Sequence, residues 1–443
     1  MGELLFGTDG VRGLAGSDLT RELAFDLGRA AVGVLGRHGE GRPTVVVGRD
    51  TRGSGEWLED ALVEGILAAG GDAILAGVEP TPAIAYLTTS LGAAAGAVIS
   101  ASHNPPEYNG IKFFDRSGTK LPDALEDEIE TALGTAVPGG IEPGSVRQID
   151  GSEHTYLDHL VSASEARLDG MTVVVDCANG AASAGAPQLL RLLGASVHAI
   201  YSSPDGTNIN DGCGALHPEV VAAEVVRIQA HAGVAFDGDA DRALFADGEG
   251  NVIDGDQVLT ACALDLHERG ALANDTLVVT VMSNLGLFKA MERAGIDVIA
   301  ASVGDRYVLE EMQRTGAELG GEQSGHVIFS RHATTGDGLL TAVRFLGLSA
   351  RTGASLADLG ARMHRFPQVL VNVEIADPSR SEASPEVAEA VRAAEKDLGA
   401  GGRVLVRPSG TEPLVRVMVE AEAEAVARRH AETIADHVRS ALG

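Results

Sequence analysis

An internal repeat of strands and helices places the strongest constraint on how this chain can fold. Three runs rich in β-branched residues, at 43–50, 171–180 and 275–286, each lead into a helix-like stretch. These stretches, at 56–69, 185–193 and 287–294, each precede a glycine of the kind that ends helices (Gly70, Gly194, Gly295). A second strand follows at once, and a third comes later, at 96–105, 232–242 and 317–326. Such alternation predicts an α/β fold with largely parallel sheets covered on both faces.

The C-terminal part of the chain follows a different pattern. Strands are expected over 371–375, 403–406 and 414–421, and helices over 385–398 and 425–442. This βαββα order predicts a smaller α+β domain. We therefore expect four domains, at 1–150, 151–254, 255–368 and 369–443.

Charge and cysteine content exclude several classes of function. The chain has 34 Lys and Arg against 63 Asp and Glu, a net charge of −29, which disfavours binding to nucleic acid and to anionic membranes. The three cysteines (Cys177, Cys213, Cys262) are too far apart for a disulfide framework or a CxxC site. Because no signal peptide or membrane-spanning apolar run is recognisable, we expect a cytoplasmic protein without a membrane partner.

Unusual polar residues follow the third strand of every repeat. The three strands end in ASHNP, DGDADR and GEQSGH. Open α/β sheets bind ligands at loops beyond the carboxyl ends of their strands. If the repeats pack around one centre, these loops face one shared cleft.

The loop after the second repeat carries a candidate metal site. Asp237, Asp239 and Asp241 alternate, so in extended backbone their carboxylates point the same way, as ligands of a hard cation such as Mg²⁺ do. A solvated acidic turn is the alternative. An EF-hand is excluded because Arg242 stands where glycine is required. A second acidic string, at 247–251, predicts a hairpin turn.

The loop after the first repeat carries Ser102, His103 and, ten residues after Ser102, Lys112. Neighbouring side chains point apart in extended chain, which disfavours Ser102 and His103 as a nucleophile–base pair. A serine that carries a phosphoryl group instead needs a metal and basic side chains around it. The alternatives are a capping serine and a surface lysine.

Other polar loops allow both a binding and a structural interpretation. The polar side chains of the GEQSGH loop could bind sugar hydroxyls, although the loop could equally be an ordinary polar turn. The candidate sugar-binding residues are Glu322, Ser324 and His326. The RPSGTEPLVRV stretch (407–417) has the arginines and the glycine-rich turn that bind phosphate, but it could also be an exposed hairpin. Its candidate residues are Arg407, Ser409, Gly410, Thr411 and Arg416. The N-terminal loop carries Thr8, Asp9 and Arg12, and its composition is equally compatible with a functional site and with a simple turn.

Taken jointly and in this order, these motifs resemble the α-D-phosphohexomutase family over essentially the whole chain. The matching motifs are FGTDGVRG (6–13), ISASHNP (99–105), NGIKFF (109–114), DGDADR (237–242), GEQSGH (321–326) and RPSGTEPLVRV (407–417). FGTDGVRG, the glutamine of GEQSGH and VGDRYV (303–308) resemble the branch that acts on glucosamine phosphates. The resemblance implies three mixed-sheet α/β/α domains and a TATA-binding-protein-like fourth domain around a central cleft.

The resemblance also implies an activity. The expected enzyme is an isomerase, an intramolecular phosphotransferase that interconverts glucosamine 6-phosphate and glucosamine 1-phosphate. The reaction runs through phospho-Ser102 and a 1,6-bisphosphate, and feeds UDP-N-acetylglucosamine and cell-wall precursor synthesis. One Mg²⁺ per subunit is the expected cofactor, and glucosamine or glucose 1,6-bisphosphate the activator. The partner is a small phosphosugar, with no nucleic acid; a homodimer is one possible assembly.

The family's roles carry over to the matching positions of this sequence. Ser102 becomes the phosphorylated serine and, with Asp237, Asp239 and Asp241, a metal ligand. Lys112 and Arg12 assist proton transfer or stabilise charge, and His103 and Arg242 flank the site. Glu322, Ser324 and His326 contact the sugar. The phosphate that does not react is held by Arg407, Ser409, Gly410, Thr411 and Arg416.

Three alternatives stay open at this stage. The same chemistry could act on glucose or mannose phosphates. A serine-dependent metallophosphatase needs similar residues but no second phosphate site. A sugar-phosphate binding protein without catalysis would carry no stable phosphate on Ser102. The residue that reads the substrate's 2-amino group, Glu322, Asp305 or neither, is also undecided.

Overall fold

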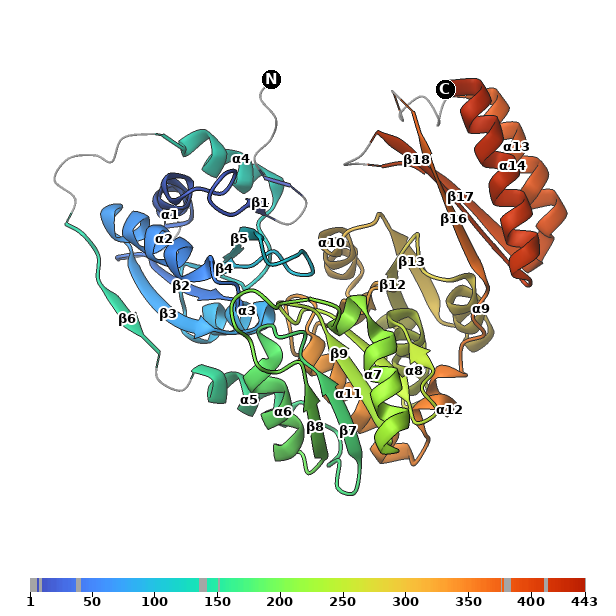
Figure 1. The fold of residues 1–443 in the computed structure, drawn as a ribbon, viewed down its shortest axis with the longest axis horizontal. Helices are drawn as coiled ribbons and strands as arrows, with labels where there is room; N and C mark the ends of the chain where they lie inside the picture. Colours follow the sequence, from blue (N-terminus) through green and yellow to red (C-terminus); the bar gives the residue numbers. More distant parts are fainter. Residues whose placement is uncertain are drawn as a thin grey trace. The chain divides into compact units, whose positions relative to one another are not determined.

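A computed structural model describes residues 6–7, 10–36, 41–134, 142–149, 152–375, 377, 384–409 and 413–442, with only the backbone described for 152–154. The chain divides into two compact units (Figure 1). The N-terminal unit comprises Met1–Val281 and Ile296–Ala361, and the C-terminal unit comprises Met282–Gly295 and Arg362–Gly443.

The first sheet of the N-terminal unit has the strand order β1-β5-β4-β2-β3-β6. Its strands are β1 (Val11–Leu14), β2 (Thr44–Arg49), β3 (Asp72–Val78), β4 (Ala95–Ile99), β5 (Tyr108–Asp115) and β6 (Val146–Gln148). The central strand β2 pairs in parallel with β3 and β4, whereas β5 runs antiparallel to β4 and β1. The sheet is therefore mixed.

Helices cover both faces of this sheet, because successive side chains of a strand point to opposite faces. Val45 and Val47 pack into a core with α1 (Arg21–Leu35), α2 (Gly55–Ala68) and α4 (Asp123–Ala132). Val46 packs on the other face against α3 (Thr81–Ser90). The continuous apolar run of β2 follows from burial on both sides.

The second and third sheets repeat this arrangement, with the orders β11-β10-β9-β7-β8 and β13-β12-β14-β15. Their strands are β7 (Thr172–Asp176), β8 (Ser196–Ile200), β9 (Ala232–Phe236), β10 (Ala243–Asp247), β11 (Val252–Ile253), β12 (Thr276–Thr280), β13 (Asp297–Ala301), β14 (Leu319–Gly321) and β15 (Val327–Phe329). The helices after α4 are α5 (Ser152–Ser162), α6 (Ala182–Leu192), α7 (Pro218–Ile228), α8 (Gly255–Glu268), α9 (Leu285–Ala294), α10 (Asp305–Thr315), α11 (Gly338–Thr352) and α12 (Leu356–Gly360).

The predicted repeat and fold class are confirmed. In each repeat the first strand pairs in parallel with the second and the third. The structure adds a fourth strand, β5, β10 or β15, which runs antiparallel to the third. The hairpin turn predicted for residues 247–251 is also confirmed, since it joins β10 to β11.

The C-terminal unit holds an antiparallel sheet of order β16-β18-β17. The strands are β16 (Gln368–Glu374), β17 (Gly402–Pro408) and β18 (Leu414–Ala421), and α13 (Pro385–Leu398) and α14 (Glu424–Leu442) cover one face (Figure 1). Val415, Val417 and Val419 of the central strand are buried in a core with α14. The predicted βαββα order is confirmed.

The helix α9 groups with this C-terminal unit, although the sequence places it in the third repeat. The backbone N–H of Leu285 donates to the buried carboxylate of Glu420 (3.2 Å), and Arg403 donates to both Glu420 (2.9 Å) and Ser283 O (2.7 Å). The Asn284 side chain exchanges two hydrogen bonds with the backbone of Phe366. These contacts attach the first turn of α9 to the C-terminal sheet.

No helix in the described ranges has the length and apolar character needed to cross a bilayer.

A buried Tyr–Asp pair joins α5 to the start of α11. The hydroxyl of Tyr156 donates to Asp337 Oδ2 (2.7 Å), and Asp337 Oδ1 caps α11 by accepting from Leu340 N (2.8 Å). Burial raises the pKa of Asp337 to about 6, although the Leu340 N–H and the Tyr156 hydroxyl oppose this shift. The next residue, Gly338, donates its N–H to Ala240 O (3.0 Å), so this pair also supports the loop after β9.

We expect Tyr156→Phe to lower the free energy of unfolding by about 1–3 kcal/mol, because a buried carboxylate loses its donor. The folded-state pKa of Asp337 lies above its unfolded value, so ionisation costs stability as pH rises through about 6. Losing the donor raises this pKa further, and the deficit should grow between about pH 5 and about pH 8. Denaturant melts at the two pH values measure it.

The matched control is Tyr86→Phe, since Tyr86 stacks on His159 (4.5 Å between ring centroids) and no hydrogen bond of its hydroxyl is recorded among the described residues. Equal losses in both variants, or a deficit that shrinks at higher pH, would contradict this account.

Candidate active site

The loop after β4, residues 100–107 (the serine loop), brings Ser102 to the loop after β9. Ser102 is buried, and its hydroxyl donates to Asp237 Oδ2 at 2.7 Å. The two loops touch so closely that a Cβ on Gly238 would lie 2.5 Å from Ser102 O. Glycine at 238 is therefore a steric requirement of this contact.

Three buried carboxylates gather beside Ser102. One ligand oxygen from each of Asp237, Asp239 and Asp241 lies within 4.8 Å of the others. Burial, followed by the charges of Asp241 and Asp239, raises the pKa of Asp237 well above its ordinary value. Among the described residues, Asp241 Oδ1 is buried and has no hydrogen-bond partner. Three carboxylates that repel one another are suitable ligands for a hard divalent cation, whose charge would offset theirs.

Basic groups reach the same loop from the first sheet. Lys112, on β5, donates its buried Nζ to Asp239 Oδ2 (2.9 Å), which also accepts from the Thr81 hydroxyl (2.6 Å). Arg12 lies on β1, opposite Gly110 of β5. The antiparallel pairing of the edge strand β1 with β5 thus places the two strands that carry Arg12 and Lys112 side by side.

His103 lies among cations. Its pKa falls to about 4 because burial and then the charges of Arg242 and Arg12 disfavour the imidazolium. The ring is therefore neutral at pH 7. Its Nδ1 is buried without a hydrogen-bond partner in the described part of the chain.

The GEQSGH loop meets the loop after β9. Ala243 N donates to Gly325 O (3.1 Å), and the charge of Glu322 is among those that raise the pKa of Arg242. Glu322 is partly exposed and accepts from Gly304 N (3.2 Å) and the Ser324 hydroxyl (3.3 Å). All three loops that follow third strands therefore meet in the N-terminal unit.

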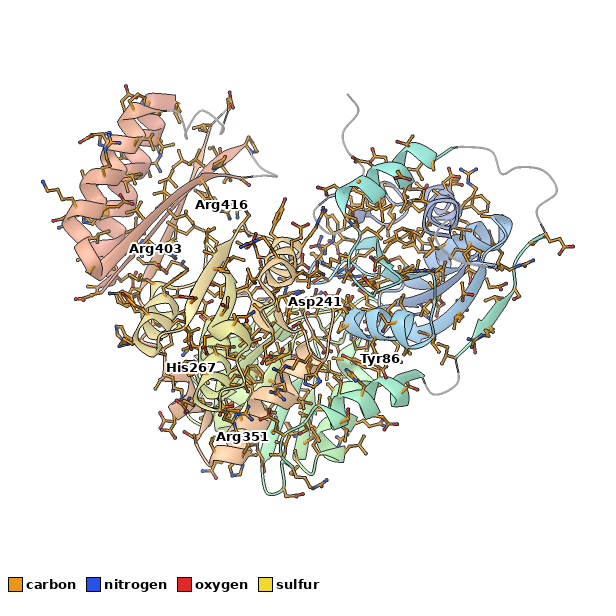
Figure 2. The ribbon with its side chains drawn as sticks, turned by 180° about the vertical axis from the view of Figure 1, so that it is seen from behind. Tyr86, Asp241, His267, Arg351, Arg403 and Arg416 are labelled. Carbon is orange, nitrogen blue, oxygen red and sulfur yellow. The ribbon has the colours of Figure 1, made fainter. Side chains whose placement is uncertain are left out.

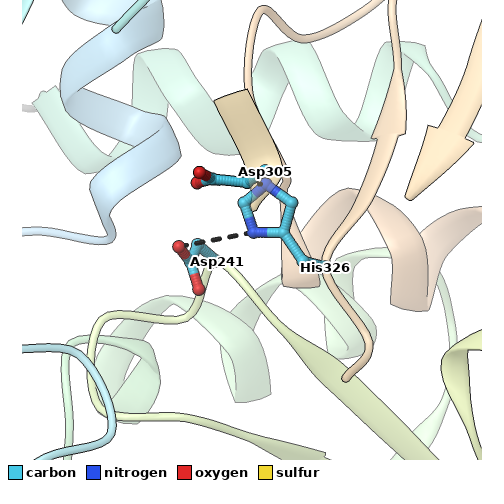
Figure 3. Close-up of side chains that lie close together, drawn as sticks. All are labelled: Asp241, Asp305 and His326. Carbon is cyan, nitrogen blue, oxygen red and sulfur yellow. Dashed lines mark ion pairs between the residues drawn. The ribbon is translucent and has the colours of Figure 1, made fainter. Parts of the chain in front are cut away.

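His326 is buried and lies between two carboxylates (Figure 3). Nδ1 is 3.4 Å from Asp241 Oδ2, whereas Nε2 accepts a hydrogen bond from Gly336 N (3.1 Å) and is 3.8 Å from Asp305 Oδ2. Asp305 also pairs with Lys120. The group Asp241, Asp305 and His326 is close enough for a metal. However, Nδ1 faces Asp241, whereas Nε2, the nitrogen nearer Asp305, already accepts from Gly336 N, so no single nitrogen is offered to an ion held by both carboxylates.

The predicted phosphate-binding arginines are cross-strand neighbours in the C-terminal unit. Arg407 on β17 stands directly opposite Arg416 on β18 (Arg416 is labelled in Figure 2). Burial and the Arg416 charge lower the pKa of Arg407, whose Nε is buried without a hydrogen-bond partner in the described ranges. Like charges placed opposite each other destabilise a sheet, so a bound anion would relieve the strain. Ser409 follows β17, while Gly410, Thr411, Thr8 and Asp9 lie outside the described residues.

Sequence patterns gave no sign of several residues that contact these two loops. Arg52 and Asn210, which come from other loops, donate to Ser102 O, whereas Thr81, the first residue of α3, donates to Asp239 of the loop after β9. Comparing the repeats would have flagged one of their neighbours. Asp50 directly follows the first strand β2, Asp176 ends the first strand β7, and each accepts from the backbone N–H two residues on.

Models of one family match most of the chain. They are described as phosphoglucomutase/phosphomannomutase alpha/beta/alpha domain I (residues 3–137), domain II (154–250) and domain III (254–366), and the C-terminal domain (370–437).

Curated relatives are similar over almost the full length. Phosphoglucosamine mutase of Frankia alni is 55% identical over 99% of this chain and 98% of its own. The Desulforamulus reducens protein of the same name is 53% identical over 97% of this chain and 99% of its own.

Solved structures agree in fold. A phosphoglucomutase/phosphomannomutase family protein from Burkholderia thailandensis is 27% identical, with a TM-score of 0.83 over 100% of this chain and 98% of its own. The N-acetylphosphoglucosamine mutase of Aspergillus fumigatus, solved with GlcNAc-6P and magnesium, has a TM-score of 0.72 at 18% identity, covering 99% of this chain and 96% of its own.

The chain belongs to the phosphoglucomutase/phosphomannomutase family, and it is an isomerase of the phosphohexomutase type.

Divalent cations should stabilise the protein through the three aspartates. Mg²⁺ at about 100 times its Kd should raise the free energy of unfolding by about 2.7 kcal/mol, because it binds the folded state alone. Asp241→Asn should lose most of this gain. The control is Glu249→Gln, which removes an exposed carboxylate from the nearby hairpin. Thermal melts with EDTA and with Mg²⁺ provide the measurement, and an undiminished gain in Asp241→Asn would refute the assignment.

Proposed function

We propose that the chain interconverts glucosamine 6-phosphate and glucosamine 1-phosphate, with Ser102 carrying the transferred phosphoryl group. The observation that carries the proposal is the hydrogen bond between Ser102 and Asp237, two residues 135 positions apart (2.7 Å). It puts the one predicted nucleophile against the predicted metal ligands. The full-length similarity to relatives named phosphoglucosamine mutase supports glucosamine as the sugar.

The proposed reaction transfers one phosphoryl group in each of two steps. In the first, a sugar hydroxyl attacks the phosphorus of phospho-Ser102. The bond from phosphorus to Ser102 Oγ breaks, Oγ takes up a proton, and a 1,6-bisphosphate forms. In the second, the bisphosphate turns around and Ser102 Oγ attacks its other phosphoryl group, so the sugar hydroxyl at that position is released. The serine ester is restored, and phosphate is conserved.

Asp237, Asp239 and Asp241 would hold the divalent cation, expected to be Mg²⁺, together with an oxygen of phospho-Ser102. When bound, the cation supplies positive charge to offset the negative charge of the phosphoryl group. Lys112 adds a second positive charge from β5, and its contact with Asp239 fixes that carboxylate in turn. Charge stabilisation and positioning are the main requirements of phosphoryl transfer.

Proton transfer falls to the groups around the serine loop. His103 is neutral at neutral pH, since burial and neighbouring arginines hold its pKa at about 4. A neutral imidazole can accept a hydrogen bond from a sugar hydroxyl, whereas Arg12 and Lys112 stabilise the developing negative charge. We propose these three residues as the groups around the reacting oxygen.

Glu322 is the better candidate for the substrate's ammonium group. Lys120 already pairs with Asp305, and His326 lies next to it. Glu322 is partly exposed, and its two hydrogen bonds come from neutral donors, although its charge also acts on Arg242. Glu322 and Ser324 would therefore contact the sugar. The buried His326 would act on Asp241 and orient that carboxylate.

The arginine pair of the C-terminal sheet would hold the phosphate that does not react. Arg407 and Arg416 are matched in register, so both guanidinium groups can bind one dianion. Ser409, Gly410 and Thr411 complete the proposed phosphate site.

The reaction would take place in the cytoplasm, where the three buried free cysteines stay reduced. Glucosamine or glucose 1,6-bisphosphate would serve as the activator that first phosphorylates Ser102. A homodimer is compatible with this scheme.

Product analysis separates this function from its alternatives. With glucosamine 6-phosphate, a mutase forms the 1-phosphate isomer, whereas a metallophosphatase releases inorganic phosphate. Equal rates on glucosamine, glucose and mannose phosphates would argue against the aminosugar as the preferred substrate. Binding without turnover or phosphoserine would identify a non-catalytic protein.

Ser102→Ala should lower kcat by more than about 10³-fold, because no other residue carries the phosphoryl group in this scheme. Intact-mass spectrometry after incubation with the bisphosphate should show an added phosphoryl group on the wild type and none on the variant. The thermal melt should stay close to that of the wild type. Retained mutase activity in the variant would exclude the phosphoserine mechanism.

Arg416→Ala should raise the KM for the sugar phosphate about 10-fold or more, because one partner of a bidentate phosphate contact is lost. The kcat should fall less than the KM rises. Arg439→Ala is the control, since Arg439 pairs only with Asp436 on the exposed face of α14 among its recorded contacts. An unchanged KM in Arg416→Ala would remove this residue from the phosphate site.

A further inference from the structure

A fully buried arginine from another loop lies beneath the serine loop. Arg52 follows β2 and is 1% exposed. Burial of a guanidinium costs several kcal/mol unless the charge is paired and every N–H is bonded. The contacts that make up for this cost indicate what Arg52 does.

Every one of the five N–H groups of Arg52 has an acceptor. Nε donates to Asp50 Oδ2 (2.9 Å), which pairs the charge. The other four N–H groups go to three backbone carbonyls of the serine loop and to that of the first residue of β5: Ser102 O (2.9 Å), Asn104 O (2.8 Å), Pro105 O and Tyr108 O (3.0 Å). Four carbonyl dipoles thus converge on one planar cation, an arrangement that would repel itself without the cation.

The same set of contacts fixes both backbone groups of Ser102. Its N–H donates to Ser100 Oγ (2.9 Å), which itself donates to Asp50 Oδ2 (2.6 Å). Its carbonyl accepts from Arg52 and from the side chain of Asn210 (2.9 Å). Asn210 repeats the Arg52 pattern, since it also donates to Asn104 O (3.0 Å).

These contacts hold Ser102 in a conformation that it would not otherwise prefer. Its φ is +50°, in the left-handed region, at a cost of roughly 1–2 kcal/mol for an L-residue. This conformation aims Oγ at Asp237. A serine that gains and loses an ester in every cycle needs such fixed geometry, because an error of about 1 Å can cost on the order of 10²-fold in rate.

We propose that Arg52 is the positioning residue of the serine loop: its guanidinium gathers four carbonyls and so sets the direction of the Ser102 hydroxyl. This inference rests on the proposed role of Ser102. Lysine cannot replace Arg52, because an ammonium has three donors, whereas Asp50 and the four carbonyls together accept five.

The kinetic test uses Arg52→Lys in the full-length protein. We expect kcat to fall on the order of 10²-fold, while the KM for glucosamine 6-phosphate stays within about twofold, because Arg52 contacts the loop and not the phosphate site. Arg49→Lys is the matched control, since Arg49 ends β2 and pairs with Glu56 and Glu59 on α2. A KM that rises in proportion, or an unchanged kcat, would overturn the proposal.

A second readout does not depend on activity. In Arg52→Lys, amide hydrogens of the peptide spanning residues 101–108 should exchange faster with deuterium, while peptides of α2 keep the wild-type rate. In Arg52→Ala, millimolar guanidinium should restore part of the lost kcat, whereas ammonium should not. Unchanged exchange in Arg52→Lys, or no rescue of a folded Arg52→Ala protein, would count against positioning.

The two proposals fail in different ways. If the wild type shows no isomerisation and no phosphate on Ser102, the proposed function fails, and the exchange measurement still decides whether Arg52 orders the loop. If the wild type is active, but the Arg52 variants show unchanged kcat, unchanged exchange or no rescue, the positioning role alone is wrong. If Arg52→Ala does not fold, the lysine variant decides.

Discussion

Crowding of negative charge is the constraint on which the rest of the site depends. Three carboxylates lie together in the interior beside Ser102, and burial, followed by their mutual repulsion, raises the pKa of Asp237. Such a cluster costs stability, because like charges are removed from water and held together. Lys112 and Thr81 on Asp239, and His326 next to Asp241, all oppose this repulsion. The cluster explains why a buried lysine, Lys112, lies here.

The threefold repeat explains how distant segments meet. Each repeat delivers one loop from the end of its third strand, and the three loops carry Ser102, the aspartates and Glu322. Parallel pairing fixes the direction of these strands, so their carboxyl ends are predictable from the chain. The fourth, antiparallel strand of the first sheet then brings Lys112 to the same place.

Sequence patterns predicted the repeat, the C-terminal α+β order and the three loops, because apolar periodicity and glycine placement are local properties. They could not predict that His326 is buried against Asp241 or that Asp305 pairs with Lys120, since both depend on contacts between separate repeats. Arg52 could not be predicted because the carbonyls that it binds, although in the same repeat, belong to another loop of that repeat. A single arginine after a strand has the composition of a surface turn, and only the convergence of four distant carbonyls reveals its environment.

The assignment of α9 to the C-terminal unit bears on how this protein can be dissected. A fragment that stops before β16 would keep the third repeat's strands but strip α9 of the Glu420 carboxylate and the Arg403 guanidinium that hold its first turn. The order of the chain and its compact units therefore differ, because the boundary between the units crosses the chain on both sides of α9. Fragments designed from the repeat alone would break the contacts between α9 and the C-terminal sheet, whereas a circularly permuted chain that keeps both elements would retain them.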